Sequence, residues 1–302
     1  MSLCRSLKGR IKINEPLKYH TTFKLGGPAQ FFAEPRNYQD LKSLLGLVKV
    51  HRKNLHVLGL GSNILVSDKG VKGVVLSLNS PFFKKISFKN NYYVDISAGA
   101  TLSRAVRLSA KRSLSGLEFL SGIPASLGGA LVMNAGVTRR KKTGRVVSMN
   151  IGDIVKEVTV MDCEGNIKTL KKKDINFKYR YSELSKYIVL KARFLLKKDG
   201  KRRIKNRIKD FLSWRKITQE QASSAGCIFK NPAGKYAGRL IDRCGLKGKK
   251  VGGAQVSLKH ANFIINKGGA KTEDVLKLIY LMRKKVKEKF NVDLKLEVKI
   301  WR

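Results

Sequence analysis

The spacing of apolar residues predicts that helices and strands are interspersed along the chain. Residues 40–50 carry leucine and valine at helical spacing, and a second helical pattern begins at Thr101 and stops before Gly116. A third begins at Thr272, which we expect to cap a helix, because the acidic residues that follow it favour the positive end of a helix dipole. Residues 236–244 are also expected to be helical.

Short apolar runs and alternating positions predict strands between these helices. Residues 294–300 alternate strictly, so their apolar side chains share one face of a predicted final strand. Gly165 and Asn166 predict a turn between two strands. The other predicted strands are residues 56–60, 71–78, 92–97, 155–160, 167–170, 187–196 and 261–266.

A glycine-rich loop lies directly after the strand-like run that begins at His56. Its sequence is Gly59-Leu60-Gly61-Ser62-Asn63-Ile64. Ile64 stands where the dinucleotide fingerprint has its third glycine, and the Gly-Lys-Ser/Thr of a P-loop is absent. The backbone N–H groups and the side chains of Ser62 and Asn63 are nevertheless suited to a diphosphate. An ordinary tight turn explains this loop equally well when it is taken alone.

A second loop, residues 121–136, combines four glycines and one proline with apolar neighbours. Its Gly-Gly pair is expected to open a helix or turn with unused N–H groups, and Asn134 offers an amide to the edge of a heterocycle. The alternative is a buried hairpin-like loop. Two such loops predict a long cofactor that contains a diphosphate. The candidate cofactor-binding residues are Gly59, Gly61, Ser62, Asn63, Ile64, Gly122, Ile123, Pro124, Ser126, Gly128, Gly129, Asn134 and Gly136.

The composition is that of a globular protein large enough for two domains. The chain has 302 residues, of which 42% are hydrophobic. We expect no membrane span, because no apolar stretch reaches the roughly 18 residues required, and without an apolar signal core we expect a cytoplasmic protein. The four cysteines lack Cys-x-x-Cys spacing, which favours reduced thiols and argues against a metal site.

The net charge of +43 is the unusual feature of the composition. One interpretation is nucleic-acid binding, since such a field attracts polyanions. The other is a lysine-rich surface without a specific partner. We favour the second, because the basic residues are scattered and no nucleic-acid-binding motif is present, so only weak nonspecific binding at low salt is expected.

The motifs and their order resemble those of the family of UDP-N-acetylenolpyruvoylglucosamine reductases. Residues 59–65 and 116–136 are similar to the two FAD-binding signatures of that family, and Tyr179-Arg180 is similar to its active-site pair. Residues 224–232, around Cys227, are similar to its catalytic loop. Further similar stretches are 20–29, 236–241 and 296–298. The motifs together cover nearly the whole chain and indicate the shorter branch of the family.

This resemblance implies an α+β fold with two parts. Residues 1–204 are expected to form an FAD-binding domain of the vanillyl-alcohol-oxidase (PCMH) type, which in the family comprises two α+β subdomains. Residues 205–302 are expected to form a smaller α+β substrate-binding domain. The resemblance also implies non-covalent FAD, NADPH as the reductant and a UDP-sugar substrate. We expect a monomer with no specific nucleic-acid partner.

The resemblance further implies a reaction and roles for individual residues. Hydride passes from NADPH to FAD, and from flavin N5 to the enolpyruvyl CH2 carbon of a UDP-sugar ether, which gives UDP-N-acetylmuramate, a peptidoglycan precursor. Arg180 binds the carboxylate and stabilises the developing charge. Cys227, which stands where the family commonly has serine, protonates the adjacent carbon. Glu297 and Tyr179 complete the catalytic set, and the candidate UDP-sugar residues are Arg215, Lys216, Asn231, Tyr236, Gln255 and Lys259.

Alternatives remain for individual residues and for the function. Cys227 is otherwise a small buried apolar residue, and Glu297 is otherwise a surface carboxylate between two lysines. Ala125 stands where the family usually has glycine, so a positive φ must be avoided there, and residues 137–144 are more basic than expected. The rival functions are a flavin oxidoreductase with another substrate and a non-enzymatic nucleic-acid binder.

Overall fold

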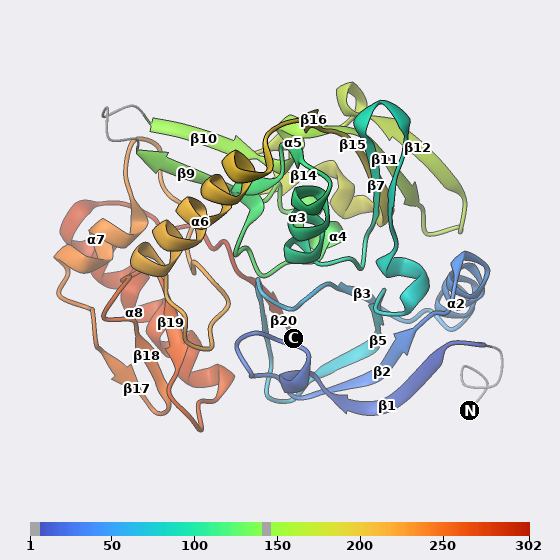
Figure 1. Cartoon of the computed structure of the whole chain (residues 1–302). Coiled ribbons are helices and arrows are strands. Elements are labelled where there is room, and N and C mark those ends of the chain that lie inside the picture. The colour runs from blue at the N-terminus through green and yellow to red at the C-terminus, as the bar shows by residue number, and fades with distance from the viewer. Residues whose placement is uncertain (1–6, 141–145) are drawn as a thin grey trace. The chain divides into compact units, whose positions relative to one another are not determined.

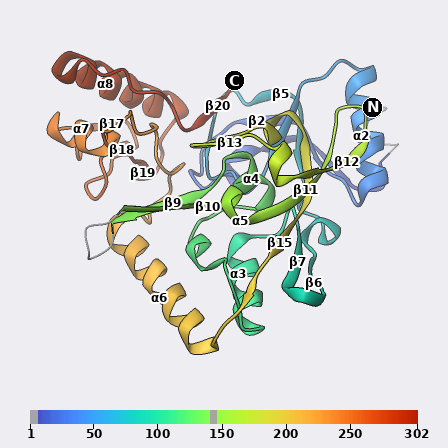
Figure 2. The same ribbon diagram turned by 90° about the horizontal axis from the view of Figure 1, so that it is seen from above.

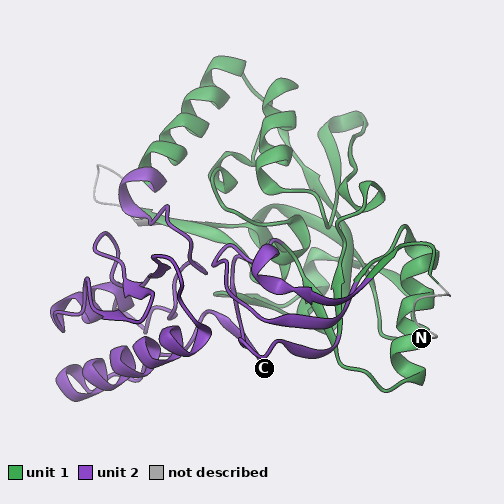
Figure 3. Cartoon of the chain, turned by 90° about the horizontal axis from the view of Figure 1, so that it is seen from below, with its two compact units in different colours: residues 1–11, 33–59, 74–214 green, residues 12–32, 60–73, 215–302 purple. Residues whose placement is uncertain are grey.

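The computed structural model describes residues 7–140 and 146–302, and it divides into two compact units (Figure 3). Unit 1 contains residues 1–11, 33–59 and 74–214, and unit 2 contains residues 12–32, 60–73 and 215–302. Two N-terminal stretches therefore pack with the C-terminal third of the chain. The expected boundary after residue 204 separates two domains of the family, whereas the compact units are defined by packing alone. The boundary therefore stays a prediction.

Unit 1 is built on a five-stranded antiparallel sheet with the strand order β12-β11-β15-β7-β6 (Figure 1). The strand bounds are β6 Ile86–Phe88, β7 Tyr93–Ser97, β11 Val155–Met161, β12 Ile167–Lys171 and β15 Ile188–Leu195. Alternate side chains of the central strands, such as Val94, Val158 and Phe194, are fully buried. The strands predicted at 92–97, 155–160 and 187–196 are therefore confirmed, and the predicted alternation at 92–97 corresponds to the two faces of β7.

Two helices of unit 1 are preceded by a residue whose hydroxyl group caps the helix. Thr101 accepts a hydrogen bond from Arg104 N–H, and Ser126 accepts one from Gly129 N–H. The helix bounds are α2 Tyr38–Val50, α3 Leu102–Lys111, α4 Leu127–Val132, α5 Ile151–Ile154 and α6 Lys201–Thr218, whose last four residues belong to unit 2. The helices predicted at 40–50 and after Thr101 are thus confirmed.

Short strand pairs complete unit 1. Three of them are antiparallel: β9 Gly136–Arg140 with β10 Val146–Asn150, β13 Phe177–Lys178 with β14 Tyr181–Ser182, and β8 Leu114–Ser115 with β16 Lys197–Lys198. Figure 2 shows β13 beside α4 and α5.

A further sheet has four strands in the order β1-β2-β5-β3. Its strands are β1 Arg10–Pro16, β2 Pro28–Glu34, β3 Leu55–Leu58 and β5 Val71–Ser77. Residues of β1, β2 and β5 are divided between the two units.

Unit 2 packs two helices, α7 Ala237–Arg243 and α8 Thr272–Phe290, with a three-stranded antiparallel sheet. Its strands are β17 Lys250–Val251, β18 Ala254–Val256 and β19 Ile264–Asn266. The apolar stripe of α8 lies in one buried cluster with Phe23, Leu65 and Phe229. In addition, β20 Lys299–Trp301 pairs in parallel with β4 Ile64–Val66, so the end of the chain lies against the segment that follows the first glycine-rich loop.

Two predictions for unit 2 are corrected by the structure. Thr272 does not cap α8 but is its first residue, because its hydroxyl donates over 2.6 Å to the carbonyl of Val66 instead. The predicted strand at 294–300 is short: Leu296 forms an isolated bridge with Phe229, and continuous pairing begins at Lys299. Leu294 and Val298 are buried and Lys295 is exposed, but Leu296 and Glu297 are both partly buried, so the predicted alternation is incomplete.

Candidate active site

Tyr179 and Arg180 form the two-residue tip of the hairpin between β13 and β14, where Lys178 pairs with Tyr181. Arg180 has a φ of +54°, in the left-handed region that favours glycine or asparagine. Its guanidinium lies 5.3 Å from the ring centre of Tyr179. A non-glycine residue in this conformation is strained, and such strain is concentrated at functional sites. The hairpin therefore presents a cation and an aromatic ring at one tip of unit 1.

The first glycine-rich loop has the geometry of an anion cradle. Gly61 has a φ of +64°, and the N–H groups of Leu60, Gly61 and Ser62 donate no hydrogen bond within residues 7–140 and 146–302. A Cβ atom at Gly61 would collide with the carbonyl oxygen of His20. Successive N–H groups left unused next to a left-handed residue are the arrangement that binds phosphate groups. This loop is therefore suited to the predicted diphosphate.

The two glycine-rich loops meet at Gly59. A Cβ atom placed there would lie 2.7 Å from the hydroxyl of Ser126 and 3.8 Å from the Cα atom of Gly129. These three residues all belong to unit 1. The absence of a side chain at Gly59 lets the first loop approach the start of α4, as a cofactor bound by both loops would require.

The expected free amides at Gly128 and Gly129 are a wrong prediction. The N–H groups of Leu127 and Gly128 donate to the carbonyl oxygens of Ala100 and Ala98, and the Gly129 N–H donates to Ser126. These groups are used because the segment before α3 packs directly on the start of α4. The short helix α4 therefore contributes a closely packed backbone, and the unused amides belong to the other loop. Ala125 avoids a positive φ, as expected.

The remaining candidates of the second loop are held in place by unit 1 itself. Asn134 is buried, and its side-chain amide bonds to the backbone of Lys178 and Gly152. Gly136 begins β9, and a Cβ atom there would lie 2.5 Å from the side chain of Asn150. A role for Gly122, Ile123 and Pro124 in cofactor binding stays a prediction. Residues 141–145 of the basic segment lie outside the described residues.

Unit 2 brings Cys227, Glu297 and Asn63 together. The Glu297 N–H donates over 2.8 Å to the carbonyl of Ile228, the residue directly after Cys227. The Asn63 side chain donates over 3.1 Å to the carbonyl of Glu297. Cys227 and Glu297 are both partly buried. A thiol and a carboxyl group predicted to be catalytic are thus carried on two segments that bond to each other.

The loop that carries Cys227 is fixed by residues that the sequence did not single out. Asn262 is 2% exposed, and its side chain both accepts from the Phe229 N–H and donates to the Phe229 carbonyl. Thr22 donates over 2.7 Å to the carbonyl of Ser224 and also bonds to Gly61. The sequence signal for Thr22 is its place in the stretch 20–29, whereas Asn262 lies in no motif.

Some of the candidate UDP-sugar residues of unit 2 already bond to the backbone of that unit. Asn231 accepts from the Ala237 N–H at the start of α7, and Gln255 donates to the Gly248 carbonyl, so both side chains already hold the backbone. Tyr236 is 46% exposed with Arg239 against its ring. Lys259 donates to the carbonyl of Lys216. Their role in substrate binding, and that of Arg215, stays a prediction.

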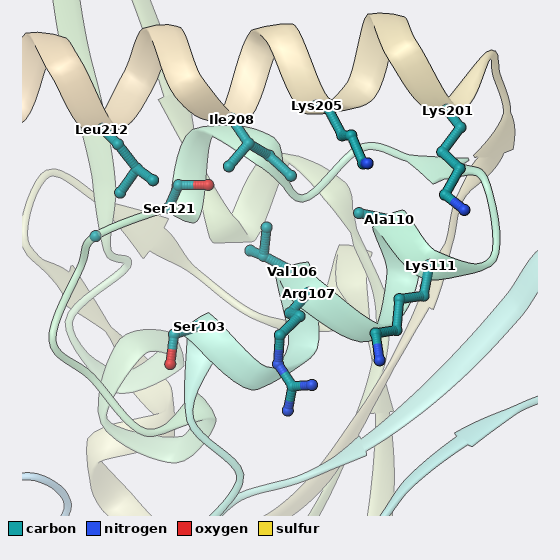
Figure 4. Close-up of a pocket in the computed structure, with 11 residues that line it drawn as sticks. Ser103, Val106, Arg107, Ala110, Lys111, Ser121, Lys201, Lys205, Ile208 and Leu212 are labelled. Atoms are coloured by element: carbon teal, nitrogen blue, oxygen red, sulfur yellow. The ribbon is translucent and has the colours of Figure 1, made fainter.

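A pocket of about 400 Å³ lies elsewhere in unit 1, between α3 and α6. Figure 4 shows Ile208 and Leu212 directed from α6 toward α3, which carries Val106 and Ala110. Gly122 is the one predicted site residue among those that line it, and the neighbouring Ser121 hydroxyl is buried. The other lining side chains are polar, and four of them are basic: Arg107, Lys111, Lys201 and Lys205. This pocket therefore does not mark the residues to which the chemistry was assigned.

Charge pairs of the partly exposed Arg207 side chain hold α6 to the segment before the second loop. Arg207 contacts Glu118 at 2.9 Å and Asp199 at 2.5 Å, and Glu118 also accepts from the Gly116 N–H. The hydrogen bond from Arg207 lowers the pKa of Asp199 to about 2. These contacts order the residues that lead into the loop at 121–136.

Two predictions about the cysteines stay predictions: that their thiols are reduced and that they form no metal site. Cys163, Cys227 and Cys244 form no disulfide within the described ranges, and Cys4 lies outside them. Among residues 7–140 and 146–302, no three His, Cys, Asp or Glu side chains gather as a metal ion requires. In the same part of the chain, no helix is both long enough and apolar enough to cross a bilayer.

Comparisons with known proteins agree with the motif order. The family model described as UDP-N-acetylenolpyruvoylglucosamine reductase, C-terminal domain, matches residues 218–301, and the model described as FAD binding domain matches residues 29–171. The UDP-N-acetylenolpyruvoylglucosamine reductase of Bacillus pumilus is 40% identical over 97% of this chain and 94% of the relative. That of Clostridioides difficile is 42% identical over 97% and 94%.

A solved structure shows the same similarity. The UDP-N-acetylenolpyruvylglucosamine reductase of Thermus caldophilus superposes with a TM-score of 0.79 at 36% identity, covering 98% of this chain and all of that one. The predicted family and the predicted α+β fold with an FAD-binding domain are therefore confirmed.

Proposed function

Because the chain belongs to the UDP-N-acetylenolpyruvoylglucosamine reductase family, we propose that it reduces UDP-N-acetylglucosamine enolpyruvate to UDP-N-acetylmuramate with FAD. The observation that carries the proposal is the hydrogen bond that joins the Glu297 backbone to the residue after Cys227. It places a thiol and a carboxyl group on adjacent segments of unit 2. Reduction of an enol ether needs a proton donor beside the carbon that becomes carbanionic.

The two glycine-rich loops fit the cofactor. The unused N–H groups of Leu60, Gly61 and Ser62 are donors for the diphosphate, and Gly59 lets the second loop approach. When bound, FAD accepts a hydride and supplies it to the substrate carbon. The matched FAD-binding model, residues 29–171, supports the same assignment. NADPH as the source of that hydride is part of the proposal.

Cys227 has the role of proton donor in this proposal. A thiol is a stronger acid than the serine hydroxyl that is common in the family, and it can give its proton to the carbon next to the reduced CH2 group. Glu297 lies on the neighbouring segment and is placed to assist that transfer. Since both residues sit on backbone that is itself hydrogen-bonded, their geometry is held before the substrate arrives.

Arg180 has the role of carboxylate ligand. Its planar guanidinium can bind the enolpyruvyl carboxylate through two hydrogen bonds and stabilise the negative charge that develops there. Tyr179, next to it at the hairpin tip, orients the carboxylate or the flavin ring. Arg215, Lys216, Tyr236 and the other candidate residues of unit 2 bind the UDP-sugar in this proposal. In this proposal the enzyme is a monomer, and the reaction takes place in the cytoplasm.

The test measures reduction and reoxidation of the flavin by its absorption. The purified protein should be yellow, with an absorption band at about 450 nm that NADPH bleaches under anaerobic conditions. Addition of UDP-N-acetylglucosamine enolpyruvate should then restore the band in a single turnover. Restoration by oxygen but not by this substrate would assign the chain to another flavin oxidoreductase. A colourless protein that takes up no FAD would refute the proposal altogether.

A further inference from the structure

The contacts of Asn134 connect the second glycine-rich loop to the hairpin that carries Arg180. Asn134 lies two residues after α4, and it is 6% exposed. Its Nδ2 group donates over 3.0 Å to the carbonyl oxygen of Lys178, and its Oδ1 atom accepts over 3.0 Å from the Gly152 N–H. Lys178 is the last residue before the hairpin tip. The amide therefore holds the backbone at the base of Arg180.

Ser182 makes a second connection on the other side of the tip. It is fully buried, and its hydroxyl donates over 2.9 Å to the carbonyl of Leu131 in α4. Both flanks of the two-residue tip are thus bound to the end of α4 or to the residues directly after it. A hairpin of two short strands is marginal by itself, so these contacts decide where its tip lies.

Gly152, in α5, completes the arrangement. A Cβ atom there would lie 2.7 Å from the ring carbon Cγ of Phe177 and 2.8 Å from Oδ1 of Asn134. Glycine is therefore what lets the first residue of β13 and the asparagine amide approach the same backbone. The helix end, α5 and the hairpin form one closely packed group within unit 1.

The strain at Arg180 explains why such a group is needed. An arginine with a φ of +54° persists only where its surroundings enforce the conformation. Asn134, whose oxygen and one amide hydrogen are used within the protein, supplies that enforcement at Lys178. The same contacts leave the asparagine less able to serve the edge of a heterocycle, the role that its place in the loop suggested.

We propose that Asn134 and Ser182 are positioning residues that fix the Tyr179–Arg180 tip against α4, so that the Arg180 guanidinium keeps the direction in which it binds a carboxylate. This inference rests on the proposed function. It gives the second glycine-rich loop an additional role, because the segment predicted to hold the cofactor also sets the geometry of the carboxylate ligand.

The test compares Asn134→Asp with Asn134→Gly. The first keeps size and tolerance of the observed φ of 44° but loses the donor to Lys178, and the second relieves the backbone while it removes the amide. We expect substrate to bind about 10- to 100-fold more weakly, measured by spectral titration of the oxidised flavin, because a small misplacement has effects of that size. FAD affinity and the rate of flavin reduction by NADPH should change less than about twofold.

Two further variants separate positioning from general loss of stability. Ser182→Ala should weaken substrate binding in the same way. The control is Thr159→Val, which removes a hydrogen bond to Thr169 in the sheet of unit 1, away from the hairpin, and should leave substrate affinity unchanged. Equal weakening in the control would overturn the inference, because any local loss of packing would then suffice.

A double-variant cycle with Arg180→Ala gives the decisive result. If Asn134 acts through Arg180, Asn134→Asp should cause no further loss of substrate affinity in the Arg180→Ala background. A full additional loss, or a tenfold weaker FAD affinity in Asn134→Asp, would overturn the inference. Unchanged substrate affinity in Arg180→Ala itself would refute the proposed carboxylate role as well. If Arg180→Ala weakens substrate binding but the Asn134 variants do not, the inference is overturned and the proposed carboxylate role of Arg180 stands.

Discussion

The side-chain amide of Asn63 donates a hydrogen bond of 3.1 Å to the carbonyl oxygen of Glu297. In return, the carbonyl of Asn63 accepts over 2.9 Å from the N–H of Lys299. The first glycine-rich loop is therefore bound to the chain on both sides of Val298, just before β20 pairs with β4. The position of a predicted catalytic carboxyl group thus depends on the conformation of a predicted cofactor loop.

This dependence predicts the effect of Asn63→Asp. The variant keeps the size of the side chain but replaces the donor with an acceptor that repels the Glu297 carbonyl. One hydrogen bond of this kind contributes about 1 kcal/mol, so we expect kcat at saturating FAD and substrate to fall about fivefold. The measurement is steady-state turnover with added FAD. Full recovery of kcat at high FAD would show instead that the residue serves cofactor affinity alone.

Replacement of Cys227 should separate the two half-reactions. Cys227→Ala removes the proton donor, so we expect reoxidation of the reduced flavin by substrate to slow by about 100-fold or more, a usual size for loss of a general acid. Flavin reduction by NADPH should be unchanged. Cys227→Ser is the matched control, because a hydroxyl keeps a proton for transfer and should retain much of the rate. Equal loss of both half-reactions would assign the thiol a structural role.

The positive φ of Arg180 predicts that two variants without its guanidinium differ in stability. Arg180→Gly and Arg180→Ala both remove the guanidinium, but only glycine adopts a φ of +54° without strain. We expect the glycine variant to exceed the alanine variant by about 0.5–1 kcal/mol in free energy of unfolding, once the entropy of the unfolded chain is included. Urea unfolding gives the comparison. Both variants should be inactive, and an alanine variant that is the more stable would contradict the assigned strain.

The ion pair of Asp199 predicts how stability depends on pH. Its pKa is lowered to about 2, chiefly by the hydrogen bond from Arg207, against about 3.9 in an unfolded chain. A depressed pKa contributes stability that is present above the unfolded value and is lost as the pH falls through the folded value. The difference in urea midpoint between the wild type and Asp199→Asn should therefore be constant above about pH 5 and vanish near pH 2. A difference that grows on acidification would have the wrong sign.

Local residue patterns predicted most of the elements and the chemistry of the loops. The helical pattern that begins at Thr101 is such a case, since the hydroxyl that caps α3 lies only three residues before the N–H that it binds. Strand β7 of the five-stranded sheet shows its inner face in the alternation of residues 92–97. Gly59 and Gly61 stand where the backbone needs positions without side chains. In each case the physical cause lies within a few residues of the signal.

Contacts between distant segments were decided by the tertiary structure alone. The partner of Asn134 is 44 positions away and that of Asn63 is 234 positions away, so nothing near either asparagine indicates the carbonyl that it binds. Thr272 has the local pattern of a cap, yet it bonds to Val66 because packing of α8 brings that carbonyl within reach. The sequence by itself determined which residues have the chemistry for a flavin reductase. Packing decided which backbone each of them holds, because a buried polar group must bond to whatever partner the folded core brings to it.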